Sequence, residues 1–400
     1  MGKISYLILV IVILSYSRIN NKIGKDENQI KVINLSSTSV PKITNLSDIA
    51  NDVEYIPLQT TSNSLITRVY RIKTYGDTII IDNLNRSSRE LIFFDNSGHY
   101  LFKLDKSGRG PGEYRYINDF DFNSKQELII NSGRDIFVYT LKGTKFTFKE
   151  ALKIIPFDST SNPQVSFFHD QNRILLSYPN RGTEKFRNLL INFQGDTLSA
   201  RPNYYKFASK EENKFLLSAG SINYSYNNLL YFKEPASDTV FTCTQSYRII
   251  PYLILNSNGK SLTPQAQVQI IKNGIKTDYS PPYIIITSIM EVPRYLFYKY
   301  EYMKTMVFGV YDKVLNKKFG INAKTFLMDD ITGGANFEPR FCSEGKLFSC
   351  IDAIELKKLT AGESFKNSKV KDPAKKEVLK RLATSLNELD NPVLIIVKPK

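Results

Sequence analysis

Short apolar segments with the composition of β-strands recur along this chain, and this repeat constrains the fold more than any other feature. A polar turn follows each of the first five segments and leads into another strand, such as Leu91–Asp95 or Ile136–Thr140. A third strand often comes next, for example Tyr100–Leu104. Alternation with a period of two argues against the helical repeats that have similar lengths. The six segments, at steps of roughly 45–65 residues, are Ile79–Asp82, Leu128–Asn131, Ile174–Ser177, Leu229–Phe232, Leu296–Tyr298 and Leu347–Cys350.

The repeat predicts an all-β fold, a six-bladed β-propeller whose blades are antiparallel meanders. The 24 Tyr and 25 Phe, with no Trp, favour strands joined by polar turns. We expect Val393–Val397 to pair with Leu347–Cys350. Residues 30–60, with Ile30–Leu35 and Val53–Leu58 as strands, would complete the same blade and leave no free sheet edge. Residues 24–400 would then form a single domain.

Two helical patterns interrupt the repeat. One begins at Thr263 and Pro264 and ends at Asn273-Gly274, which predicts a helix inserted between blades four and five. The other begins at Asp372-Pro373 and is part of a helical insertion, residues 352–391, in the last blade. Its expected apolar face consists of Val378, Leu382, Leu386 and Leu389.

The N-terminal region has the pattern of a secretory signal peptide, which we assign to residues 1–23. Lys3 precedes an apolar run from Tyr6 to Leu14, too short for the roughly 20 residues of a transmembrane helix. No other stretch has the length of a transmembrane span. The sequence therefore predicts an exported protein in the periplasm, in the cell envelope or outside the cell.

The net charge of +15 favours an anionic partner, and export argues against nucleic acid as that partner. With only two His and three Cys, few groups are available for His-dependent catalysis or metal binding, so we expect no cofactor and no metal. Cys342 and Cys350 flank a predicted hairpin turn at Glu344 and Gly345. That turn places Cys342 opposite Leu347, so the two sulfur atoms would be out of register for a disulfide.

The most distinctive segment is Gly108–Tyr114, with the sequence GRGPGEY. Together with Phe94–Gly98, Asn118–Asp121 and the DNPVL sequence at Asp390–Leu394, it resembles a family of secreted six-bladed β-propellers abundant in gut-associated bacteria and loosely related to NHL-repeat propellers. The resemblance covers nearly the whole mature chain and implies export, often as a lipoprotein. Here Tyr16 and Ser17 follow the apolar run where a lipidated Cys would stand, so a lipid anchor is not expected.

Five residues are candidates for ligand binding. Arg109, Glu113 and Tyr114 would provide donors and acceptors at the central opening of the propeller. Alternatively, the GRGPGEY segment is a structural turn between blades, with Arg109 and Glu113 paired to neighbours. Asp119 would share a strand face with Asp121. Asp330 lies in an acidic, Gly-containing loop, for which a plain turn is the alternative.

These observations favour a monomeric, non-enzymatic binding module that presents a basic, Tyr-rich surface to an extracellular ligand such as an acidic glycan or a peptide. Two alternatives remain open. One is an NHL-like propeller enzyme, a lyase or hydrolase, acting at the central channel. The other is a scaffold of the cell envelope that binds a protein partner through the inserted helices.

Overall fold

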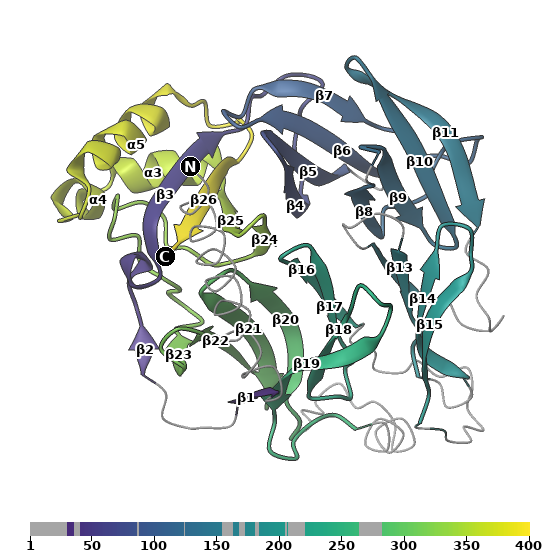
Figure 1. Ribbon diagram of the computed structural model, residues 1–400. Coiled ribbons are helices and arrows are strands. Elements are labelled where there is room, and N and C mark those ends of the chain that lie inside the picture. The colour runs from purple at the N-terminus through teal and green to yellow at the C-terminus, as the bar shows by residue number, and fades with distance from the viewer. Residues whose placement is uncertain are drawn as a thin grey trace, which may run out of the picture.

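Six small β-sheets arranged in a ring confirm the predicted six-bladed β-propeller, as Figure 1 shows. The computed structural model describes residues 30–35, 41–85, 88–123, 125–153, 163–167, 173–180, 184–204, 206, 221–263 and 282–400. The predicted signal peptide and most of the helix predicted after Thr263 lie outside these residues.

The first five blades are meanders of four consecutive antiparallel strands. Blade one contains β4 (Val69–Tyr75), β5 (Thr78–Asn85), β6 (Ser88–Asp95) and β7 (Tyr100–Leu104). Blade two contains β8 (Asp119–Phe122), β9 (Leu128–Ser132), β10 (Asp135–Lys142) and β11 (Lys145–Lys153). Blade three contains β12 (Gln164–Phe167), β13 (Arg173–Ser177), β14 (Phe186–Asn192) and β15 (Thr197–Pro202). Blade four contains β16 (Ile222–Tyr226), β17 (Leu229–Lys233), β18 (Thr239–Cys243) and β19 (Ile249–Asn256). Blade five contains β20 (Ile285–Glu291), β21 (Tyr295–Tyr302), β22 (Thr305–Asp312) and β23 (Lys317–Ile321).

Blade six closes the ring with strands from both halves of the chain. Its order is β24 (Phe341–Ser343), β25 (Lys346–Ile351), β26 (Val393–Pro399) and β3 (Ala50–Pro57). Leu347 lies opposite Val397, which confirms the predicted pairing of the C-terminal strand. Leu394 in turn lies opposite Ile56, so the predicted strand at Val53–Leu58 also closes this blade. The predicted register of Cys342 opposite Leu347 is confirmed as well.

The expectation that Ile30–Leu35 belongs to the closing blade is wrong. Strand β1 (Lys31–Asn34) pairs in parallel with β19 of blade four, and β2 (Lys42–Ile43) pairs in parallel with β23 of blade five. Ile33 and Leu35 are buried there, and the Tyr300 hydroxyl donates a hydrogen bond of 3.2 Å to the Leu35 carbonyl. These short strands cover sheet edges that would otherwise be exposed.

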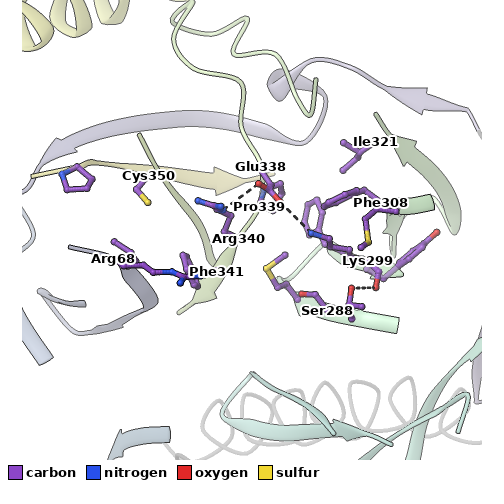
Figure 2. Close-up of a pocket in the computed structure, with 18 of the residues that line it drawn as sticks. Arg68, Ser288, Lys299, Phe308, Ile321, Glu338, Pro339, Arg340, Phe341 and Cys350 are labelled. Atoms are coloured by element: carbon purple, nitrogen blue, oxygen red, sulfur yellow. Dashed lines mark hydrogen bonds and ion pairs between the residues drawn. The ribbon is translucent and has the colours of Figure 1, made fainter. Parts of the chain in front are cut away.

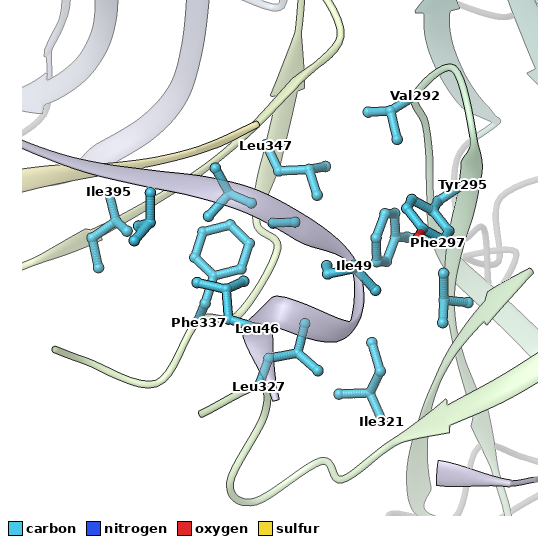
Figure 3. Packing of buried hydrophobic residues seen from close by; sticks show 14 of the residues in the cluster. Leu46, Ile49, Val292, Tyr295, Phe297, Ile321, Leu327, Phe337, Leu347 and Ile395 are labelled. Atoms are coloured by element: carbon cyan, nitrogen blue, oxygen red, sulfur yellow. The ribbon is translucent and has the colours of Figure 1, made fainter. Parts of the chain in front are cut away.

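Apolar side chains fill the spaces between neighbouring blades and hold the ring together. Figure 3 shows the cluster between blades five and six, where the short 3-10 helix η1 (Leu46–Asp48) inserts Leu46 beside Phe337. Leu46 and Phe337 are both fully buried, and Leu347 and Val397 pack in the same cluster. Burial on this scale is the main favourable contribution to folding.

Three helices connect β25 to β26, namely α3 (Ala353–Ala361), α4 (Glu363–Asn367) and α5 (Pro373–Ser385). Helix α5 begins as predicted, because the Asp372 side chain accepts a hydrogen bond of 2.9 Å from the Lys375 amide. Its predicted apolar face is wrong in part. Leu379 and Ala383 are the residues of α5 that are buried against α3, whereas Val378 is 54% exposed, and Leu389, beyond the helix, is 93% exposed.

Candidate functional site

The first strand of every blade faces the axis of the ring, and these six strands line a central cavity of about 1200 Å³. Along this axis β4 contacts β24, β8 contacts β12, and β20 contacts both β16 and β24. Polar and aromatic side chains form much of the wall, including Tyr116, Asn118, Gln164, Asn223, Tyr226 and Asn228. Among the described residues, the axis leaves a cavity whose volume is that of a ligand of moderate size.

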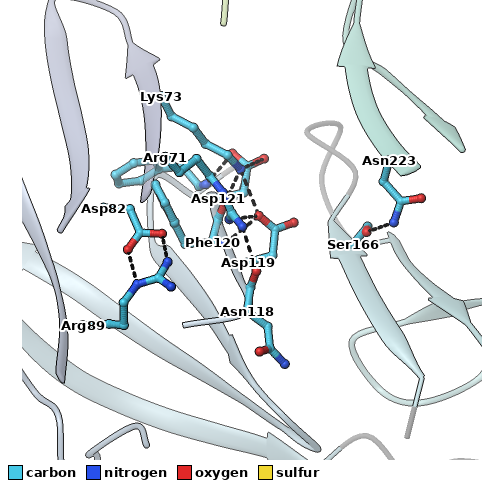
Figure 4. Close-up of polar contacts among 11 residues, drawn as sticks. Arg71, Lys73, Asp82, Arg89, Asn118, Asp119, Phe120, Asp121, Ser166 and Asn223 are labelled. Atoms are coloured by element: carbon cyan, nitrogen blue, oxygen red, sulfur yellow. Dashed lines mark hydrogen bonds and ion pairs between the residues drawn. The ribbon is translucent and has the colours of Figure 1, made fainter. Parts of the chain in front are cut away.

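A charged cluster joins β4 to β8 on one wall of the central cavity (Figure 4). Arg71 Nη1 lies 2.6 Å from Asp119 Oδ1, and Lys73 Nζ lies 3.3 Å from the same oxygen. Asp121 Oδ2 is 3.5 Å from Lys73 Nζ. The period-two alternation on each strand brings these four side chains to one face, as predicted for the two aspartates.

The backbone and the ring of Phe120 complete this cluster. Arg71 Nη2 donates a hydrogen bond of 2.8 Å to the Asn118 carbonyl, and Lys73 Nζ donates one to the Phe120 carbonyl. Lys73 Nζ also lies 4.8 Å from the centroid of the Phe120 ring. Each cation thus has several partners that fix its position, which is the kind of rigid polar surface that a specific site needs.

A second polar cluster, missed in the sequence, lies at the end of β20 on the wall of the central cavity. The buried Glu291 carboxylate accepts hydrogen bonds from the hydroxyls of Tyr224 (3.0 Å) and Tyr252 (2.7 Å), and Lys313 Nζ lies 2.9 Å from it. Burial, and then the Glu291 charge, raise the pKa of Tyr224 and of Tyr252 well above the ordinary value, so both stay protonated donors. Lys313 also lies 4.2 Å from the centre of the Tyr226 ring.

Asn223 has a polar atom that nothing in the described chain satisfies. Its amide nitrogen donates a hydrogen bond to Ser166 of the neighbouring blade. Its Oδ1 is buried, and no hydrogen-bond partner for it exists among the described residues. Buried polar atoms are normally paired, so a water or a ligand group at the cavity wall would complete this one.

Charge is nearly balanced in the central cavity, although the whole chain is strongly basic. The charged side chains on its described wall are Arg71, Lys73, Arg340, Asp119, Asp121, Glu291 and Glu344. The net charge of +15 is therefore not concentrated on the axis. The cavity wall does not select for an anionic ligand by charge alone.

The GRGPGEY segment forms a compact turn between β7 and β8 and does not line the central cavity. Tyr114 is fully buried, and its hydroxyl lies within hydrogen-bonding distance of the carbonyls of Arg89 (3.1 Å) and Leu104 (3.2 Å). Burial raises its pKa well above the ordinary value. Tyr114 is thus an anchor of the turn and out of reach of a ligand.

The Glu113 side chain folds back onto this turn and bonds to its backbone. Its carboxylate accepts a hydrogen bond of 2.8 Å from the Gly110 amide and lies directly over Gly108, where a Cβ would come within 1.9 Å of Glu113 Oε2. A side chain at position 108 would therefore displace the Glu113 carboxylate from the turn. Arg109 is exposed and makes no ion pair with any residue that the structure describes. A ligand role for Arg109 stays a prediction.

Asp330 joins three distant segments and also lies outside the central cavity. Its carboxylate accepts hydrogen bonds from the Ser47 amide (2.9 Å) and hydroxyl (2.6 Å), and Lys371 Nζ is 3.2 Å away. The preceding Asp329 accepts a hydrogen bond of 2.9 Å from Tyr55. The two aspartates therefore tie η1, blade six and the segment before α5 together. Of the five predicted ligand-binding residues, Asp119 is the one on the cavity wall.

The fold and the cavity define a class of protein, a six-bladed β-propeller with a cavity along its axis. Within this class, the chain belongs to the family described as "Domain of unknown function (DUF4934)", whose model matches residues 30–398. No curated protein matches the chain.

Two solved structures share the fold at low sequence identity. A candidate exported protein of Bacteroides fragilis is 19% identical with a TM-score of 0.64, and the match covers 93% of this chain and 100% of that one. A member of the DUF4221 family from Bacteroides vulgatus is 12% identical with a TM-score of 0.50, and the match covers 88% and 97% of the two chains. These likenesses support the propeller architecture. The predicted relation to NHL-repeat propellers stays a prediction.

Metal-binding clusters and membrane-spanning helices are both absent from the part of the chain that the structure describes. These residues contain no group of three or more His, Cys, Asp or Glu side chains placed to hold a metal ion. Among the same residues, no helix has the length and apolar character needed to cross a membrane.

Proposed function

We propose that this protein is an exported binding propeller that takes a glycan into its central cavity without catalysing a reaction. The observation that carries the proposal is the cavity itself, about 1200 Å³ in volume, to whose wall all six blades contribute polar side chains beside apolar ones. Amide groups such as those of Asn118 and Asn228 offer paired donors and acceptors, which match the vicinal hydroxyls of a sugar. The predicted signal peptide and the likeness to a candidate exported protein support export.

Tyr116 is the best aromatic platform for a sugar ring on this wall. It is 47% exposed, and its hydroxyl lies over Gly133, where a Cβ would come within 2.5 Å of it. Tyr116 lines the cavity and keeps about half of its surface exposed, and sugar rings stack on aromatic rings that are accessible in this way. The unpaired Oδ1 of Asn223 would accept a hydroxyl hydrogen from a ligand or a bridging water.

The balanced charge of the wall changes the expected ligand from an acidic to a neutral glycan. Arg71 and Lys73 already hold Asp119 and Asp121, so neither cation is available without breaking an ion pair. Neutral ligands bind with little dependence on ionic strength, whereas binding to a basic outer surface weakens as salt is added. Salt dependence therefore distinguishes the cavity from the surface.

The test is a glycan and peptide array probed with the mature protein at low and high salt. We expect glycan binding that changes little with salt. Ser225→Phe, which fills the cavity from β16, should abolish it, and Tyr116→Ala should weaken it about tenfold, the loss of one aromatic contact. The matched control is Tyr204→Ala, because Tyr204 is 79% exposed and lies off the cavity wall.

Two other results would contradict the proposed site or the proposed ligand. Binding that survives Ser225→Phe and weakens steeply with salt would place an acidic ligand on the outer surface and refute the cavity proposal. Selective peptide binding lost in Ser225→Phe would keep the cavity but replace the glycan. Arg109→Ala in the same array tests the predicted role of the GRGPGEY turn, since Arg109 lies outside the cavity wall.

A further inference from the structure

A second cavity of about 650 Å³ opens between blades five and six, beside the start of blade one (Figure 2). We call it the side cavity. Strands β20, β21, β22 and β23 of blade five form one side of its wall. The other side comes from β24, β25 and the segments Ile66–Val69 and Glu338–Arg340. Neighbouring blades of a propeller usually fill this space with interlocking side chains. Here the two blades leave room for a ligand of small-molecule size.

The inner part of the side cavity is apolar. Phe297, Phe308, Met290, Ile321 and Phe341 contribute its surface. Phe297 and Ile321 also belong to the buried core between the two blades, so this floor is held by tight packing. A ligand with an aliphatic or aromatic body would bury its surface here, at about 25 cal/mol per Å² of apolar area removed from water.

The floor also depends on a glycine that allows a close contact. Tyr298 lies directly over Gly309, where a Cβ would come within 2.3 Å of the ring. Both residues line the side cavity. Glycine at this position allows the Tyr298 ring to lie in close contact with the backbone of β22.

The rim of the side cavity is cationic. Arg68, Lys299 and Arg340 line it, against the carboxylates of Glu338 and Asp352. Glu338 is shared, at 3.8 Å from Lys299 Nζ and 3.4 Å from Arg340 Nε. Arg68 is exposed and makes no ion pair with any described residue. One guanidinium is therefore in excess, and guanidinium groups bind carboxylates in a bidentate manner.

Lys299 connects the rim to the floor. Its ammonium nitrogen lies 4.5 Å from the centre of the Phe308 ring, which is both part of the apolar wall and a partner for the cation. The cavity thus offers positive charge at its mouth and apolar surface behind it. This is the complement of an amphiphilic anion.

We propose that the side cavity binds a small organic anion with an apolar body, its carboxylate at Arg68 and Arg340 and its body against Phe297 and Phe308. This site is separate from the glycan site proposed for the central cavity. The two adjoin at Met290, Arg340 and Phe341, which line both.

The probes are 8-anilinonaphthalene-1-sulfonate, an apolar anion whose fluorescence rises in apolar sites, and a matched pair of competitors, decanoate and decanol. We expect the fluorescent probe to bind the full protein, and decanoate to displace it at least about tenfold more tightly than decanol, because only decanoate pairs with a guanidinium. Acetate, which lacks the apolar body, should not displace it.

Two matched variants locate the binding. Ser288 lines the side cavity alone and Ser225 the central cavity alone, so Ser288→Phe should abolish binding of the probe and Ser225→Phe should preserve it. Arg68→Gln should reduce the preference for decanoate over decanol several-fold, because Arg340 alone then faces the carboxylate, while Arg109→Gln, at another exposed arginine, should leave it unchanged. Arg68 is exposed, so this variant keeps the test valid even if Ser288→Phe fails to fold.

The proposal is overturned if decanol competes as well as decanoate, or if the folded Ser288→Phe variant still binds the probe. Loss of binding in Ser225→Phe with retention in Ser288→Phe would also overturn it, since the anion would then occupy the central cavity. The glycan array tests a different ligand at the central cavity, so failure of one proposal does not imply failure of the other.

Discussion

Replacing Gly112 by Ala tests whether the GRGPGEY turn is a packed structural joint between blades one and two. Gly112 is buried, has a φ of +72°, and would place a Cβ 2.5 Å from Cγ and 2.8 Å from Cβ of Phe148 on β11. The Cβ atom is held by the backbone of the β-strand and stays in place when the side chain rotates, whereas Cγ can move with χ1. The change therefore combines a strained backbone with a steric clash.

The two costs can be separated with a matched glycine. Gly143 has a similar φ of +61°, but a Cβ added there would have no neighbouring atom within 4 Å. Gly143→Ala should cost only the left-handed backbone penalty, about 1–2 kcal/mol. Gly112→Ala adds about 1–3 kcal/mol for overpacking, which brings its total to about 2–5 kcal/mol.

Urea unfolding followed by circular dichroism measures the free energy of unfolding of each variant, with the slope checked to confirm that the denatured state is unchanged. Phe148→Ala removes Cγ and leaves only Cβ near residue 112, so Gly112→Ala should cost about 1 kcal/mol less in that background. If Gly112→Ala costs no more than Gly143→Ala, the turn is not packed against β11 and the reasoning is refuted.

Three further changes test the ring closure, the anchor of the turn and the aspartate that joins distant segments. Leu394 is fully buried in the closing strand β26, so Leu394→Ala should destabilise the fold by about 2–5 kcal/mol in urea unfolding. Leu389→Ala, at 93% exposure, should be neutral, and equal effects of the two changes would contradict the closure. Tyr114→Phe should cost about 1–2 kcal/mol, because it removes a buried donor from backbone carbonyls, and an unchanged unfolding midpoint would show that the hydroxyl is not needed. Burial raises the pKa of Asp330, but the hydrogen bonds from Ser47 and the hydrogen bond and positive charge of Lys371 together lower it below 3.8. The contribution of this carboxylate to stability is therefore present above pH 3.8 and is lost as the pH falls through the folded pKa. Asp330→Asn should therefore be less stable at pH 7 and lose less stability between pH 5 and about pH 2; parallel pH profiles would argue against the linkage.

The sequence indicates the second strand of each blade clearly and the first strand poorly, for a physical reason. Strands such as β5 and β9 are buried on both faces, so their apolar runs stand out. The first strands face the cavity and carry polar side chains, as in the sequences DFDF of β8 and INYSY of β16. The residues that form the candidate site are thus the ones with the weakest fold signal.

A single sequence also does not show which strands pair with each other. The alternation of Asp119 and Asp121 predicted their shared face, and the same alternation of Arg71 and Lys73 could have suggested a matching basic face. Nothing local, however, specifies that these strands are neighbours. For the same reason a four-residue strand such as Lys31–Asn34 gives no indication of the blade that it joins.

The placement of the first three strands has a consequence for the order of events during biosynthesis. Strands β1, β2 and β3 leave the ribosome first, yet their partners β19, β23 and β26 are made roughly 200–350 residues later. Blades one to three are made during that interval, while the leading segment still has no sheet to join. Each of the three pairings is therefore a long-range docking made by one short piece of chain. Such a step is slow, and it leaves the unfinished chain open to proteases and to pairing with its own copies.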